Sequence, residues 1–118
     1  MDMSQFKKEF IDEAVKQSDV INNSLKNLDS KTLTELSRAA HILKSSSATM
    51  GYMQLSKLSK AMEETLNEII SKKIEITSMI SNVLTESFNA LLDLIKAIRE
   101  DKKERDVSEL ITKLKRIV

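Results

Sequence analysis

The 118-residue sequence contains no proline, cysteine or tryptophan, and it has only one glycine and one histidine. Without cysteine, the chain has no disulfide framework, no thiol nucleophile and no thiolate metal site. A single histidine excludes a zinc or di-iron site built from several histidines. The lack of proline and near lack of glycine remove the residues that most often interrupt helices. These absences favour an all-α protein.

Long apolar runs and an excess of one charge are also missing. The net charge is +1, which gives no electrostatic reason to expect nucleic acid or an anionic membrane as a partner. The opening MDMSQFKKEF lacks the apolar centre of a signal peptide, and no run approaches the ~18 apolar residues of a membrane span. We therefore expect a cytoplasmic protein.

What the chain does contain is typical of one folded domain. Apolar residues make up 41% and charged residues 31% of the sequence, the balance of an ordinary globular protein. A chain of this length is expected to form one domain with one hydrophobic core.

The spacing of apolar residues predicts five helices. Their approximate ranges are 4–28, 31–50, 53–72, 77–100 and 106–117. On the second helix, Ser47 is expected to face inward. The predicted apolar stripe of the third helix consists of Leu55, Leu58, Met62, Leu66 and Ile69, and that of the fourth of Ile80, Leu84, Leu91, Ile95 and Ile98. Gly51 is placed to end the second helix, Thr77 to cap the fourth, and Asp106 with Glu109 has the spacing of a capping box for the fifth. Four long amphipathic helices with short links predict an antiparallel up-down four-helix bundle, with the short fifth C-terminal helix packed outside it or leading onward.

The histidine, His41, lies on the second predicted helix, just beside its buried stripe. It is about 100° round the helix from the core position Ala40, so we expect the ring to be half exposed. Lys44 and Ser45 lie one turn further on the same face. A side chain as small as serine at position 45 would leave another protein free to approach the ring.

Counting from the bend places an acid at the height of this histidine. His41 lies ten residues before Gly51 and Glu63 twelve after it. With two residues allowed for the turn, both lie ~15 Å from the bend of an antiparallel hairpin. We therefore predict contact between them, although Glu63 could instead pair with Lys60, three residues earlier.

This arrangement suits transfer of a phosphoryl group. A carboxylate that accepts a hydrogen bond from Nδ1 would leave the Nε2 lone pair of an uncharged imidazole free to attack phosphorus. Lys44 would neutralise phosphoryl oxygens on Nε2, or it is simply a solvated residue of the flank. Hydrolysis is not expected, because the chain offers no second base, oxyanion pocket or metal site.

The stretch AAHILKSSSATMGYMQLSKLSKAMEE, which contains these residues, resembles the histidine-phosphotransfer (HPt) motif, His-x-x-Lys-Gly followed by a later glycine. Within that family it is most similar to the N-terminal domain of chemotaxis histidine kinases of the CheA type. The resemblance implies that residues 1–118 form a single HPt domain, which we expect to be a fragment of a larger kinase.

The resemblance also implies roles and partners. His41 would be the phosphoacceptor, Glu63 its orienting partner and Lys44 a phosphoryl-stabilising cation. The domain would have no ATP site and no cofactor. It would take the phosphoryl group from a separate histidine kinase ATP-binding domain and pass it to a CheY-like response regulator, while the isolated domain would be a monomer. Ser45 departs from the family's usual glycine, so we expect transfer to survive but to be slower.

Two other functions remain open on the sequence alone. One is a free-standing phosphorelay intermediate that carries the phosphoryl group between two aspartates. The other is a helical scaffold or adaptor that has kept the fold and binds partners without phosphorylation.

Overall fold

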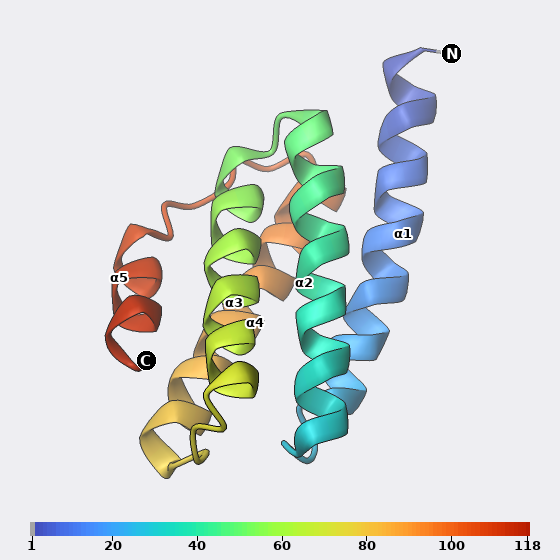
Figure 1. Ribbon diagram of the computed structural model, residues 1–118. Helices are drawn as coiled ribbons and strands as arrows, with labels where there is room; N and C mark the ends of the chain where they lie inside the picture. The colour runs from blue at the N-terminus through green and yellow to red at the C-terminus, as the bar shows by residue number, and fades with distance from the viewer. Residues whose placement is uncertain (1) are drawn as a thin grey trace.

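A computed structural model describes residues 2–118 as an all-α fold (Figure 1). Met1, which the predicted domain 1–118 includes, lies outside the described residues. The helices within this part of the chain are α1 Met3–Ser24, α2 Ser30–Met50, α3 Met53–Ser71, α4 Ser78–Arg99 and α5 Ser108–Arg116. The predicted fold class, four long helices and a short fifth one, is confirmed.

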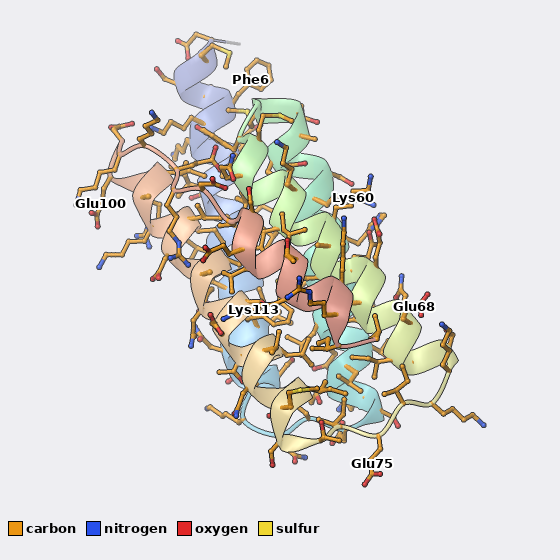
Figure 2. The ribbon with its side chains drawn as sticks, turned by 90° about the vertical axis from the view of Figure 1, so that its left-hand side faces the viewer. Phe6, Lys60, Glu68, Glu75, Glu100 and Lys113 are labelled. Carbon is orange, nitrogen blue, oxygen red and sulfur yellow. The ribbon has the colours of Figure 1, made fainter. Side chains whose placement is uncertain are left out.

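The four long helices run alternately up and down (Figure 1). Each packs on the next in the chain, and α4 closes the ring by packing on α1. The most extensive contact joins α2 to α3. The short helix α5 lies outside this ring against α3 and α4, and Figure 2 shows it in front of them. None of the helices in residues 2–118 is long and apolar enough to cross a lipid bilayer.

The predicted apolar stripes form most of the core. In α3, every predicted member is buried: Leu55, Leu58, Met62, Leu66 and Ile69. The predicted stripe of the fourth helix did not include Phe88 and Leu94, which are also buried in α4. Because α4 contacts α1, α3 and α5, it buries a wider face than one apolar stripe.

The prediction for the end of the first helix is wrong. α1 ends at Ser24 rather than near residue 28, and Leu25 and Leu28 lie half-buried in the following turn. The reason is the strong start signal of α2, where Asp29 and Thr32 cap each other. The Thr32 N–H donates to the Asp29 carboxylate at 2.9 Å, and the Asp29 N–H donates to the Thr32 hydroxyl at 2.8 Å. The chain must leave α1 early enough to form this capping box.

The start of the last helix also differs from the prediction. α5 begins at Ser108, and Asp106 forms no capping box with Glu109. The Asp106 carboxylate instead accepts hydrogen bonds from the backbone N–H, at 2.9 Å, and the hydroxyl of Ser108. This short-range Asx turn uses the oxygen that a capping box would need.

Three helices end in a left-handed turn. Gly51 after α2 has φ 80°, as predicted for a terminating glycine, whereas Lys73 after α3 and Asp101 after α4 have φ 52° and 57°. In each case the next N–H bonds to the carbonyl five residues earlier, as in a Schellman motif. These bonds are Tyr52 to Ser47 at 2.9 Å, Ile74 to Ile69 at 3.0 Å and Lys102 to Ala97 at 2.8 Å.

Glycine is expected to be favoured at the left-handed positions. Lys73→Gly should raise the free energy of unfolding by about 1 kcal/mol, because a side chain is strained in this conformation. Gly51→Ala should lower it by a similar amount through φ alone, since a Cβ at Gly51 would meet no atom within 4 Å. Urea unfolding measures both effects. Lys73→Ala, which keeps the strain, is the control and should match the unchanged protein; a Gly51→Ala variant of unchanged stability would contradict the prediction.

Candidate functional site

The candidate site lies on the exposed flank where α2 packs against α3. Two cross-helix pairs, one turn apart, set the register of these antiparallel helices. The Ser37 hydroxyl donates to the Asn67 side-chain oxygen at 2.7 Å. One turn further along α2 and one turn back along α3, His41 meets Glu63. The site is therefore held by the same packing that forms the bundle.

The contact expected from counting residues is present. His41 Nδ1 lies 2.6 Å from Glu63 Oε2. The histidine side chain is 58% exposed, whereas that of Glu63 is only 15% exposed. Within residues 2–118, no protein atom forms a hydrogen bond with Nε2 of His41. The acid is thus largely covered by the bundle while the ring projects toward solvent.

Lys44 lies one turn along α2 from His41 and contacts the same acid. Its Nζ donates to Glu63 Oε1 at 2.7 Å, and its side chain is 31% exposed. The sequence placed Lys44 on this face but did not predict its pairing with Glu63. The spacing of His41 and Lys44, three residues apart on α2, could have indicated this pairing, because it lets both side chains reach one carboxylate.

The alternative pairing of Glu63 with Lys60 is not what the structure shows. Both carboxylate oxygens of Glu63 accept hydrogen bonds from α2 residues. Lys60 is an exposed residue at the edge of α3 in Figure 2, one turn before Glu63.

The charge of Glu63 decides the tautomer of the histidine. Burial raises the pKa of Glu63, but the hydrogen bonds from Lys44 and His41 outweigh it, so its pKa lies below the ordinary value. At neutral pH the carboxylate is ionised and can only accept hydrogen bonds. The proton between them therefore lies on Nδ1 of His41, so a lone pair of the ring can only be on Nε2.

The serines after the histidine have different surroundings. Ser45 is exposed one turn from His41, followed by exposed Ala48 and Thr49. Ser47 points inward and is fully buried, as the sequence indicated. Apart from Lys44, the exposed side chains that follow His41 along this part of α2 are therefore small, which leaves room for a large partner.

The His41 ring lies on an open surface, since its side chain is 58% exposed. A groove of about 580 Å³ between α3 and the C-terminal end is lined by residues such as Thr65, Glu68 and Lys115, and His41 is not among them. A nucleophilic nitrogen on an open flank suits a reactant that another protein presents. This separates the site from the concave pockets of most enzymes.

Comparison with known proteins identifies the family of this chain. Residues 5–101 match the model of the Hpt domain family, and the chain belongs to that family. It is an Hpt phosphotransfer domain related to the CheA proteins of chemotaxis two-component systems.

The relatives show the extent of this relationship. Chemotaxis protein CheA of Bacillus subtilis is 35% identical over 120 residues, covering 97% of this chain and 18% of the relative. For CheA of Borreliella burgdorferi the identity is 31% over 116 residues, covering 92% and 13%. The sensor histidine kinase CheAY of Helicobacter pylori is 27% identical over 127 residues, covering 98% and 16%. The chain thus spans less than a fifth of the length of these curated relatives.

The titration of Glu63 should report its two partners. In a carbon-13 NMR titration, the pKa of the Glu63 carboxyl should lie below the ordinary value of about 4.3 and rise in Lys44→Met, which removes a charged donor. Because the folded-state pKa is the lower one, this interaction stabilises the fold above the unfolded-state pKa and is lost as pH falls through the folded-state pKa.

Lys60→Met is the matched control, since it removes the nearby cation that does not contact Glu63. It should leave the Glu63 midpoint unchanged. A larger rise in Lys60→Met than in Lys44→Met would contradict the assignment of Lys44 as the partner.

Proposed function

We propose that His41 is the phosphoacceptor of this Hpt domain. It would accept a phosphoryl group from the ATP-binding domain of a histidine kinase and pass it to an aspartate of a CheY-like response regulator. The observation that carries the proposal is the hydrogen bond between Nδ1 and Glu63, 2.6 Å long, on a ring that is 58% exposed. It leaves the Nε2 lone pair as the nucleophile on an open surface.

The chemistry follows from the position of the proton. The Nε2 lone pair attacks the γ-phosphorus of ATP, the bond from phosphorus to the bridging oxygen breaks, and ADP leaves. The ring becomes positively charged while Nδ1 keeps its proton, and the Glu63 carboxylate stabilises that charge. In the second step an aspartate oxygen attacks phosphorus, the bond to Nε2 breaks, and the neutral ring returns.

Lys44 and Ser45 have supporting roles in this proposal. Lys44 lies one turn from His41, and release from Glu63 would allow its ammonium group to neutralise the phosphoryl oxygens. Ser45 would limit access to the ring only by a hydroxymethyl group. The domain itself would need no cofactor, would act as a monomer in the cytoplasm, and would form part of a longer kinase.

Replacement of the acceptor tests the proposal directly. With a kinase domain of a CheA relative and γ-labelled ATP, the chain should acquire label that is stable in alkali and lost in acid, as a phosphohistidine is. His41→Gln should abolish the label because no other histidine exists in the chain. Label that persists in this variant would reject His41 as the acceptor. An unlabelled domain that still binds the response regulator would support the adaptor alternative.

Glu63→Ala should slow phosphorylation of His41 by about tenfold or more, by analogy with metal-binding histidines, where loss of the orienting partner costs about 10–100-fold. The expected cause is loss of the fixed tautomer. The neighbouring, exposed Glu64→Ala is the matched control and should keep the original rate constant. Circular dichroism should show both variants folded, and equal rates for the two would refute the orienting role of Glu63.

A further inference from the structure

The start of α3 is capped by a residue far away in the sequence. Tyr52 precedes the helix and makes no side-chain cap; its ring packs instead against Phe10 of α1, with centroids 5.0 Å apart. The first N–H groups of a helix have no partner within the helix. One of them, the Leu55 N–H, donates at 2.8 Å to Oε2 of Glu104, which lies in the connector between α4 and α5.

A second hydrogen bond runs in the opposite direction. The N–H of Val107, at the end of the connector, donates to the side-chain oxygen of Gln54 at 3.2 Å. Val107 is 2% exposed, so the connector is packed against the bundle at this point. The two bonds tie the connector to the first turn of α3. The positive end of the α3 dipole also favours the carboxylate of Glu104.

The first turn of α3 connects this cap to the phosphoacceptor site. Ser56, the residue after Leu55, has its hydroxyl 3.5 Å from the backbone carbonyl of Lys44 on α2. The Lys44 side chain in turn holds Glu63. The first turn of α3 therefore lies against the part of α2 that supplies one of the two donors to Glu63.

We propose that Glu104 is a positioning residue for phosphoryl transfer. By capping α3 it keeps the first turn of that helix against α2, and so keeps Glu63 in register with His41 and Lys44. This inference rests on the proposed function of His41. In this proposal, the connector and α5 help to hold the site in place and do not only pack on the outside of the bundle.

The test compares Glu104→Ala with Glu104→Gln, which keeps an acceptor oxygen. Glu104→Ala should speed hydrogen exchange of the Leu55 amide by about tenfold. It should also shift the nitrogen-15 signals of the His41 ring toward a mixture of tautomers. With the kinase domain, kcat for phosphorylation should fall about fivefold with KM unchanged, within the range of indirect couplings. Glu104→Gln should restore most of each property.

Asp106→Ala is the matched control in the same connector, because within residues 2–118 its carboxylate accepts hydrogen bonds from Ser108 and from no residue of α3. All three measurements should stay at the original values. If Glu104→Ala proves too unstable, Glu104→Asp, one methylene shorter, should give intermediate changes.

The outcomes separate this proposal from the function itself. If Glu104→Ala speeds Leu55 exchange but leaves the His41 signals and kcat unchanged, the cap is purely structural and the proposal is overturned. Unchanged Leu55 exchange in this variant would overturn it as well. Absence of label on the unaltered domain would reject phosphoryl transfer, while the ring signals would still report whether Glu104 positions Glu63.

Discussion

The Glu63 carboxylate accepts hydrogen bonds from two side chains of the neighbouring helix, His41 and Lys44, and the geometry of the site depends on this shared acceptor. Its side chain is only 15% exposed. Covering a carboxylate in this way is unfavourable unless donors compensate it, and here both oxygens are satisfied. The same interaction holds the imidazole in one tautomer and keeps the Lys44 ammonium group on the carboxylate that the ring contacts.

This interaction requires α2 and α3 to keep one register. The left-handed turn at Gly51 joins them with minimal slack, and the Ser37–Asn67 bond repeats the alignment one turn away. A slip of one residue along either helix would rotate His41 or Glu63 by about 100° and separate the pair. The extensive packing between these helices therefore maintains the fold and sets the reactive geometry.

In this bundle, the core that stabilises the fold and the exposed histidine lie in different places, which suits a phosphotransfer domain. Its core is largely apolar, and the exposed His41 ring projects from the outer flank, where another protein can reach it. In the proposed function, nucleotide binding is left to a partner. That agrees with a chain that belongs to the Hpt family and spans less than a fifth of its CheA relatives.

The sequence by itself determined the helices, most of the core, the turn at Gly51 and the height match of His41 with Glu63. These features depend on periodic spacing and on residues close to one bend, so they can be counted along the chain. Tertiary structure decided the wide burial of α4, the pairing of Lys44 with Glu63 and the cap that Glu104 provides to α3. Glu104 and Leu55 are 49 residues apart, and such a contact leaves no periodic signal because it exists only once the connector has packed across the assembled bundle.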